Sequence, residues 1–325
     1  MKKVNVAVVG ATGLVGRKII EVLEERNFPV NELIPLASEK SEGKEIEFKG
    51  KKVKVRKLDE NSFDKGIDIA LFSAGASVSE KFVPIAIKNN VRCVDNSSFY
   101  RMDDKVVLVV PEINKDKIDS NTMLIANPNC STIQSVLPIK PIYDNFKIKR
   151  IVYNTYQAVS GGGQKALEDL HNRTNKKWKY KIYNNVLPQI DVFTDNGYTK
   201  EEMKMINETR KIFDDYNLKI TATTARVPVE NCHCVSINIE LDRDFDLDFI
   251  RKILEEQDGV KVIDNPKEEL YPIPTMVTGS DDIYVGRIRR DYSIDYGINL
   301  WVVGDNIRKG AATNAVENAE VLLEV

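Results

Sequence analysis

The sequence predicts an α/β fold with two domains, and three observations lead to this prediction. The apolar run 4–9 leads through a glycine-rich turn into an amphipathic stretch that ends near Leu23. Short apolar runs then alternate with helical patterns up to Ala126, an order typical of a parallel sheet covered by helices. Beyond Cys130 the strands become longer and alternate apolar with polar residues. We therefore expect a first domain at residues 1–128 with 306–325, and a second, α+β domain at residues 129–305.

The turn after the first strand reads Gly10-Ala11-Thr12-Gly13-Leu14-Val15-Gly16. Glycines at this place permit a tight turn, let the backbone approach a pyrophosphate and aim the following helix N-terminus at its charge. The spacing is GxxGxxG, in the strand–turn–helix context that a dinucleotide site requires. The alternative is a tight turn of an α/β domain that binds no ligand. We predict a Rossmann-type dinucleotide-binding domain.

The second strand, 32–37, ends at Ser38-Glu39-Lys40-Ser41, where the adenosine ribose would lie. An acidic residue there selects the 2′-hydroxyl of NAD, whereas a hydroxyl and a cation suit the 2′-phosphate of NADP. The segment contains both kinds. We favour Ser38 and Lys40 as phosphate ligands with Glu39 turned to solvent; the alternative is a solvated charged loop.

The remaining strands of the first domain are expected at 67–73, 91–94, 106–110 at a sheet edge, and 123–126, with a helix at 79–88. Ligands bind at the carboxyl ends of parallel strands. Ser73-Ala74-Gly75 and the segment 96–101 lie at such ends. Arg101 could therefore clamp an anion, or it could be an ordinary surface cation.

Cys130 falls at a strand-to-helix turn, between the strand 123–126 and a helix at 131–143 bounded by Pro138 and Pro141. A thiol at a helix N-terminus faces unpaired N–H groups and the positive end of the helix dipole, which lower its pKa below the usual ~8.5 and favour the thiolate. The alternative is a small buried residue at a tight turn. We predict that Cys130 is a nucleophile.

The second half of the chain should contain five strands and a C-terminal helix that belongs to the first domain. A long strand at 149–159 carries Gln157 near its end and runs into Ser160-Gly161-Gly162-Gly163, which permits close approach to a ligand or a flexible connection. A helix at 199–213 carries Glu201 and Lys204, which as an i,i+3 pair on one face are interpreted as a solvated salt bridge. Strands at 222–229 and 232–241 should form an antiparallel hairpin, and strands at 283–292 and 298–303 should pair. The segment 304–310 should open a helix that extends to Leu323 and returns to the first domain.

His233 is the expected proton-transfer partner of the thiol. A lone His at the start of a half-buried strand is more often structural, yet a thiol nucleophile needs a base. The other His, His171, lies in a charged helical stretch that should be exposed. The choice of His233 rests on this elimination.

The composition excludes several classes of function. The chain is 42% hydrophobic and 30% charged with a net charge of −2, which leaves no basic footprint for nucleic acid. No apolar run approaches the ~18 residues of a membrane span, and no signal peptide is evident, so we expect a cytoplasmic protein without a membrane partner. Four Cys without CxxC spacing and two His favour neither a disulfide scaffold nor a metal site.

Seven motifs resemble those of the aspartate-β-semialdehyde dehydrogenases, in that family's order and over the whole chain. They are GATGLVG (10–16), NSSFYR (96–101), NPNCST (127–132), TYQAVSGGG (155–163), GYTKEEMK (197–204), RVPVENCH (226–233) and GDNIRKGAATNAV (304–316). The resemblance implies a glyceraldehyde-3-phosphate-dehydrogenase-like catalytic and dimerisation domain after the Rossmann-type domain. It also implies NADP as cofactor and a homodimer or homotetramer.

Carried over by motif, the resemblance implies a role for individual residues. Cys130 would be the acylated thiol, His233 the acid/base and Gln157 the group that orients the acyl carbonyl. Arg226 would hold the substrate α-carboxylate and Glu201 its α-ammonium, while the phosphate would be held by Arg101, Lys204 and Asn129. Cofactor contacts would come from Gly10, Thr12, Gly13, Leu14, Val15, Ser38, Lys40, Ser73, Ser160, Gly161 and Asn306. The family more often has Arg where this chain has Lys40, and a Lys lacks the forked phosphate contact.

The implied reaction is the NADPH-dependent reduction of 4-aspartyl phosphate to aspartate 4-semialdehyde, reversibly, through a Cys130 thioester, on the pathway to Lys, Met, Thr and diaminopimelate. Two other interpretations compete with it. An N-acetyl-γ-glutamyl-phosphate reductase would share the thiol and the His but would not need Glu201 for a free ammonium. A non-catalytic Rossmann protein that senses NADP would have no reason to hold Cys and His in matched motifs.

Overall fold

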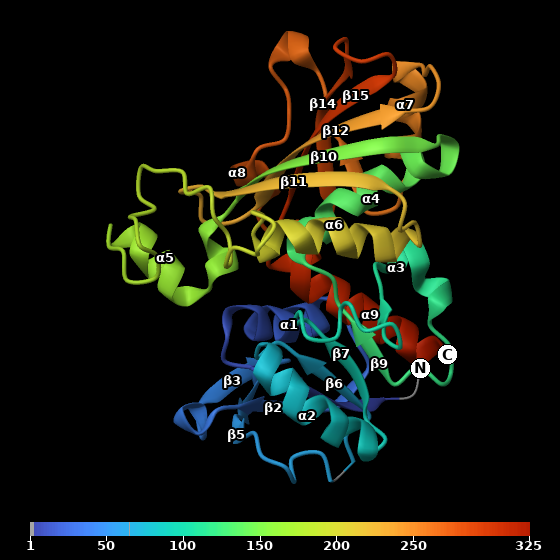
Figure 1. Ribbon diagram of the computed structural model, residues 1–325. Helices are drawn as coiled ribbons and strands as arrows, with labels where there is room; N and C mark the ends of the chain where they lie inside the picture. The colour runs from blue at the N-terminus through green and yellow to red at the C-terminus, as the bar shows by residue number, and fades with distance from the viewer. Residues whose placement is uncertain (1–2, 65) are drawn as a thin grey trace. The chain divides into compact units, whose positions relative to one another are not determined.

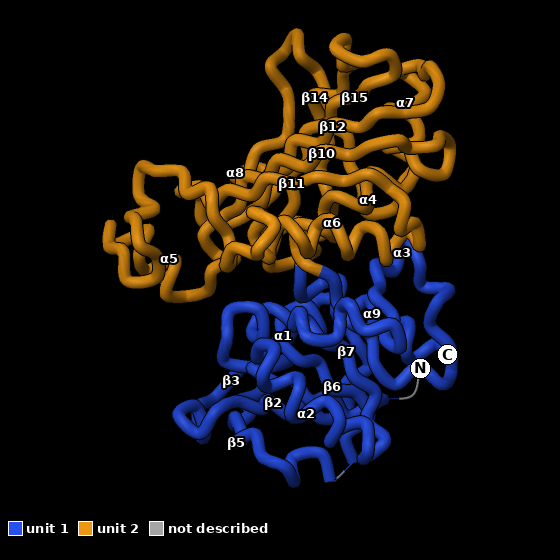
Figure 2. Tube along the Cα trace, viewed as in Figure 1, with its two compact units in different colours: residues 1–128, 311–325 blue, residues 129–310 orange. Residues whose placement is uncertain are grey.

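The structure is a computed structural model that describes residues 3–64 and 66–325 (Figure 1). The chain forms two compact units, one of residues 1–128 with 311–325 and one of residues 129–310 (Figure 2). The predicted return to the first unit begins at residue 306, whereas the boundary lies between Gly310 and Ala311. Within the described ranges, no helix is long and apolar enough to cross a membrane.

The first unit is a doubly wound parallel sheet, as predicted. Its strand order is β5-β2-β1-β6-β7-β9-β8, and every neighbouring pair is parallel. The central strand β1 (Val4–Val9) has alternate side chains in two hydrophobic clusters, one with α1 (Leu14–Glu25) and α9 (Asn314–Glu324), the other with α2 (Ala76–Lys88). Burial on both faces explains why the strands read as continuous apolar runs. The other strands are β2 (Val30–Ala37), β5 (Arg56–Lys57), β6 (Ile69–Phe72), β7 (Arg92–Asp95), β8 (Val107–Leu108) and β9 (Leu124–Ala126).

The expected strands of this unit are all present, with ends that differ by up to two residues. Strand β5 and a two-stranded hairpin, β3 (Glu45–Phe48) with β4 (Lys51–Lys54), are not among the predicted strands, because their charged side chains mask the alternation. Helix α9 packs on β6, β7 and α1, so the predicted return of the C-terminus to the first domain is confirmed. Short helical turns lie at η1 (Glu39–Ser41), α3 (Pro111–Asn114) and η2 (Lys115–Lys117).

The second unit is a mixed six-stranded sheet in the order β11-β10-β12-β15-β14-β13. Strand β10 (Ile148–Gln157) is parallel to β11 (Lys219–Arg226) and antiparallel to β12 (His233–Leu241). The predicted hairpin of these last two segments is therefore wrong, since β10 lies between them. The segment that connects β11 to β12 is hydrogen-bonded to the end of β10 and to the residues after it: Val227 N–H donates to Gln157 O, and Ser160 N–H donates to Glu230 O. The chain therefore crosses the end of β10 before β12 begins, and β12 does not pair with β11.

Helices cover one face of this sheet. Helices α4 (Cys130–Asn145), α6 (Lys200–Phe213) and α7 (Leu247–Glu255) contact its strands (Figure 1). Pro138 and Pro141 lie inside α4 and do not bound it, contrary to the prediction, because burial of nearly the whole helix offsets the backbone hydrogen bonds that they remove. The predicted pairing of β14 (Ile283–Asp291) with β15 (Gly297–Gly304) is confirmed. The remaining elements are η3 (Val159–Gly162), α5 (Gln164–His171), β13 (Val260–Val262), η4 (Pro266–Glu268), α8 (Pro274–Val277) and η5 (Arg308–Thr313).

Candidate active site

The N-terminus of α4 carries the candidate nucleophile. Asn129 is the N-cap, and its Oδ1 accepts from the N–H groups of Ser131 at 2.9 Å and Thr132 at 3.3 Å. Cys130 is the first residue of this helix, which puts its thiol at the positive end of the helix dipole. The side chain of Asn129 thus satisfies two backbone N–H groups of the first turn, and the Cys130 thiol faces the site.

His233 is the polar neighbour of this thiol. Its Nε2 lies 3.3 Å from Cys130 Sγ, and its Nδ1 accepts from Ala158 N–H at 2.9 Å. The ring is fully buried at the start of β12. Burial first, and the cation Arg226 second, lower the pKa of His233 well below 6.5. His171 is exposed and pairs with Glu230, so the structure brings together Cys130 and the His that elimination selected.

The other three thiols have surroundings that suppress ionisation. Cys93, Cys232 and Cys234 are buried, whereas Cys130 is partly exposed. Burial raises the pKa of Cys232 and of Cys234 to about 12, and burial with the nearby Asp95 raises that of Cys93 still further. A buried thiol in apolar surroundings is inert as a nucleophile.

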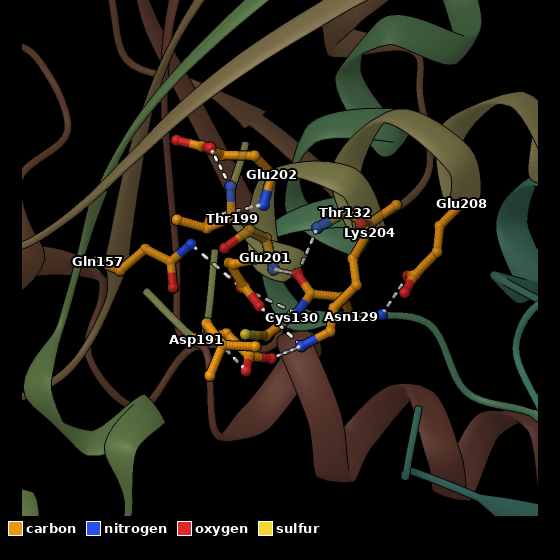
Figure 3. Close-up of polar contacts among 12 residues, drawn as sticks. Asn129, Cys130, Thr132, Gln157, Asp191, Thr199, Glu201, Glu202, Lys204 and Glu208 are labelled. Atoms are coloured by element: carbon orange, nitrogen blue, oxygen red, sulfur yellow. Dashed lines mark hydrogen bonds and ion pairs between the residues drawn. The ribbon is translucent and has the colours of Figure 1, made fainter. Parts of the chain in front are cut away.

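A network of buried polar groups from α6 meets the turn before α4 (Figure 3). Glu201 Oε1 accepts from Asn129 Nδ2 at 3.0 Å and from Gln157 Nε2 at 3.2 Å, and its Oε2 lies 3.2 Å from Lys204 Nζ. The predicted Glu201–Lys204 pair is present but is not solvated, because the face of α6 that carries Glu201 packs on the sheet and α4 and leaves this residue 5% exposed. Lys204 also reaches Asp191 Oδ2 at 3.0 Å.

The charges in this network hold one another ionised. Burial alone would raise the pKa of Glu201, but Lys204, the Asn129 amide and Arg226 outweigh it and hold the pKa below its usual value. Burial would likewise lower the pKa of Lys204, yet Glu201 and Asp191 raise it overall. The site therefore presents a charged carboxylate and a charged ammonium side by side.

Arg226 ends β11 directly beside Gln157 in the sheet register. Its Nη1 donates to Ala158 O at 2.6 Å, and its Nε has no hydrogen-bond partner in the part of the chain that the structure describes, although the residue is only 5% exposed. A Cβ at Gly161 would lie 2.9 Å from this Nη1 and 3.2 Å from the His233 ring, so the glycine leaves room for both side chains. A buried guanidinium with an unused N–H is suited to bind a carboxylate.

Three groups that hold the site together are not among the residues predicted from the sequence. Glu208 accepts from Asn129 N–H at 2.6 Å, Asp191 binds Lys204, and the Ala158 backbone binds both His233 and Arg226. Glu208 lies seven residues after Glu201, two turns along the same helix face, and this spacing could have revealed it. Asp191 lies in a loop and Ala158 acts through its main chain, so neither has a signal in the sequence.

The glycine turn of the first unit has the geometry of a phosphate cradle. Gly10 has φ +86°, and a Cβ there would lie 2.9 Å from the Ser73 backbone. A Cβ at Gly16 would lie 2.1 Å from Gly10 O. Gly13 is the N-cap of α1, whose first turn holds no acidic residue. The backbone is therefore closely packed at this helix N-terminus, which fits the binding of a dinucleotide pyrophosphate. The predicted cofactor residues in this region are Gly10, Thr12, Gly13, Leu14, Val15 and Ser73.

The other predicted cofactor and anion residues are held as follows. Ser38 caps η1, Lys40 is exposed, and Glu39 is largely exposed with its carboxylate 3.3 Å from Lys57 Nζ. Ser160 Oγ accepts from Asn306 Nδ2 at 3.0 Å in the second unit, where both residues are buried. In the first unit, Arg101 donates to Asn127 O at 2.9 Å and to Asn96 O at 2.8 Å. No group of three potential metal ligands occurs in residues 3–64 and 66–325.

Known proteins resemble this chain over its full length. Two family models match it, one described as the NAD binding domain of semialdehyde dehydrogenases over residues 5–121 and one as their dimerisation domain over residues 139–309. The aspartate-semialdehyde dehydrogenase of Aquifex aeolicus is 53% identical, with 98% of each chain covered. That of Campylobacter jejuni is 46% identical, with 100% of this chain and 98% of the relative covered.

A solved structure agrees with these sequence relatives. The crystal structure of aspartate semialdehyde dehydrogenase II from Vibrio cholerae, complexed with ASA, is 44% identical, with a TM-score of 0.94 and 100% of this chain and 99% of that chain covered. The likeness covers both units and every motif that the sequence analysis singled out. The chain therefore belongs to the aspartate-semialdehyde dehydrogenase family.

Proposed function

We propose that this enzyme reduces 4-aspartyl phosphate to aspartate 4-semialdehyde through a thioester on Cys130, with His233 as the partner of the sulfur. The observation that carries the proposal is the position of Cys130 Sγ, at a helix N-terminus and 3.3 Å from His233 Nε2. Covalent capture of the acyl group divides one difficult step into two easier ones. Backbone N–H groups at the start of α4 are suited to stabilise the oxyanion that forms on the acyl carbon.

The charged groups around the thiol suit the two ends of an amino acid. Arg226 would bind the α-carboxylate with its fork, and Glu201 would accept from the α-ammonium. Gln157 and Asn129 already bind Glu201 and would turn their remaining polar atoms to the acyl carbonyl and the phosphate, the latter together with Lys204 and Arg101. The ionised, buried Glu201 favours a free ammonium over the acylated one of an N-acetyl substrate.

The cofactor proposal is NADP, which supplies a hydride when it is bound in the reduced form. The pyrophosphate would lie on the glycine turn, held by Gly10, Thr12, Gly13, Leu14 and Val15. The 2′-phosphate would meet Ser38 and the exposed Lys40, since Glu39 is directed to Lys57. Ser73, Ser160, Gly161 and Asn306 complete the proposed cofactor residues.

The test is the phosphate-dependent reduction of NADP with aspartate semialdehyde as substrate. Cys130→Ser should lose several orders of magnitude in turnover, because a hydroxyl lacks the reactivity of a thiolate, yet it should bind NADPH as the parent does. Cys234→Ala removes a buried thiol and serves as the matched control. Near-parental activity of Cys130→Ser would refute the covalent route.

The oligomeric state is proposed to be a homodimer or homotetramer. Large apolar side chains of this unit are exposed: Tyr156 lies on β10, while Tyr271 lies just before α8 and Met276 within α8, which contacts β15. An exposed apolar surface of this kind is typical of an interface. Light scattering of the purified chain tests the mass of the assembly, and the cytoplasmic location stays a prediction from the sequence.

A further inference from the structure

The contact of His233 with the main chain determines which ring nitrogen carries a proton. Ala158 N–H donates to Nδ1 at 2.9 Å. A nitrogen that accepts from an N–H group offers its lone pair and carries no proton of its own. The single proton of the neutral ring then resides on Nε2, which is the nitrogen 3.3 Å from Cys130 Sγ.

The surroundings also oppose a second proton on the ring. A proton on Nδ1 would point at the Ala158 amide hydrogen and lose the only attraction of that contact. The ring is fully buried, and the nearest cation, Arg226, is tied to the same residue through Ala158 O at 2.6 Å. Burial and Arg226 both disfavour the imidazolium, in agreement with the lowered pKa.

We propose that His233 is a fixed hydrogen-bond donor to a Cys130 thiolate, held in its Nε2–H tautomer by the Ala158 N–H, and that the pair is not a thiolate–imidazolium pair. The inference rests on the proposed role of Cys130 as the nucleophile. The Arg226 guanidinium, which interacts electrostatically with Cys130, and the N-terminus of α4 supply positive charge near the sulfur. Ala158 is thus a positioning residue that acts through its main chain.

The proton balance of the proposed reaction agrees with a donor that never gives up its proton. Attack by the thiolate forms the C–S bond and breaks the C–O bond to phosphate, which leaves with the electron pair and takes up the one proton that the reaction consumes. After the thioester carbon has accepted a hydride, the resulting alkoxide re-forms C=O, breaks the C–S bond and returns the electron pair to sulfur. Neither step transfers a proton to or from His233. The Nε2–H can stabilise both the thiolate and the alkoxide.

Nitrogen NMR of protein labelled with ¹⁵N-histidine tests the tautomer directly. The chain has only two His, and His171→Asn assigns the spectrum by removing the other signal. We expect one protonated nitrogen, Nε2, from about pH 6 to pH 9, the range in which an ordinary His and an ordinary Cys titrate. The rate of Cys130 alkylation by iodoacetamide, followed over the same range, reports the thiolate.

Two results would overturn the inference. One is a doubly protonated His233 ring at a pH where Cys130 reacts as a thiolate, together with the loss of that second proton in Cys130→Ser. The other is a neutral ring with its proton on Nδ1. Either would leave the proposed function intact, since that proposal fails only if Cys130→Ser keeps its turnover.

A pair of variants tests the role of the Ala158 N–H. Ala158 has φ −63° and ψ 152°, a backbone conformation that proline also adopts, and proline replaces the N–H with a Cδ that would lie against Nδ1 and displace the His233 ring. Ala158→Gly keeps the N–H and is the matched control. We expect the His233 titration midpoint to rise by roughly one pH unit in Ala158→Pro relative to Ala158→Gly, since the displaced ring no longer meets the N–H that opposes a proton on Nδ1. Identical His233 spectra in the two variants would refute the role of the N–H, and the spectrum of the unmodified chain decides the tautomer even if Ala158→Pro does not fold.

Discussion

Glu208→Gln tests how helix α6 fixes the turn that presents the nucleophile. Glu208 is 1% exposed, and its carboxylate accepts from Asn129 N–H at 2.6 Å. Asn129 in turn caps α4 immediately before Cys130. The substitution keeps the size of the side chain and one acceptor oxygen but removes the charge.

The magnitude follows from the class of hydrogen bond. A hydrogen bond to a charged group contributes about 1.5–3 kcal/mol and a neutral one about 1 kcal/mol, so the free energy of unfolding should fall by about 0.5–2 kcal/mol. If about half of this loss distorts the turn, alkylation of Cys130 by iodoacetamide should slow by up to roughly fivefold, since 1.4 kcal/mol is about tenfold in rate. Urea unfolding and the second-order alkylation rate constant measure the two effects.

Glu202→Gln is the matched control on the same helix. Its carboxylate accepts from Thr199 N–H at 2.7 Å and from Thr224 N–H at 2.9 Å, and both donors lie outside the α4 turn. We expect a comparable loss of stability with an alkylation rate within about twofold of the parent. Equal slowing in both variants would show that α6 acts only through overall stability. An unchanged alkylation rate in Glu208→Gln, despite the lost stability, would refute the positioning role.

Four further predictions follow from the same geometry. Ala variants of Cys232 and Cys234 should keep most activity because these thiols are buried and hard to ionise; a loss as large as that of Cys130→Ser would mean that the nucleophile is wrongly assigned. Lys40→Ala should raise the KM for NADP and leave NAD use nearly unchanged, whereas equal weakening for both cofactors would assign Lys40 to the loop alone. Arg226→Lys should lose roughly 1.5–3 kcal/mol of transition-state stabilisation in kcat/KM for aspartate semialdehyde while iodoacetamide alkylation of Cys130 stays fast; equal slowing of the alkylation would contradict a substrate clamp. Burial and Arg226 lower the pKa of His233 in the folded protein, so the neutral ring contributes fully to the free energy of unfolding above about pH 6.5. This contribution should decline as the pH falls toward the folded-state pKa, by at most ~1.4 kcal/mol per pH unit. The free energy of unfolding measured in urea should therefore depend more steeply on pH below about 6.5 in the parent than in His233→Asn.

Local patterns were sufficient for the architecture of the first unit and for the position of the thiol. Continuous apolar runs such as Val4–Val9 predict strands buried on both faces, and the glycines after that strand predict the close backbone approach that Gly10 and Ser73 make. The apolar spacing after Cys130 predicts the helix that begins there. Each of these features depends on residues close together in the chain, so the sequence carries them directly.

Strand pairing in the second unit depends on more than local pattern. Residues 219–226 and 233–241 are neighbours in sequence and each has strand character, yet β10 lies between them because the connection bonds to the end of that strand. The prolines of α4 are a second example, since local propensity ends the helix there and tertiary burial continues it through both.

The surroundings of the site were decided by the tertiary structure alone. The sequence identified Cys130, His233, Glu201 and Arg226, but their states depend on partners distant in the chain: Glu201 binds Gln157 across 44 residues, Asn129 binds Glu208 across 79, and His233 binds Ala158 across 75. Local spacing predicts that Glu201 and Lys204 form a surface ion pair, whereas the packing of α6 buries Glu201 and leaves only Lys204 partly exposed. The sequence determines which chemical groups are present, whereas burial and long-range contacts determine their protonation and orientation, because solvation and neighbouring charge are properties of the folded surroundings.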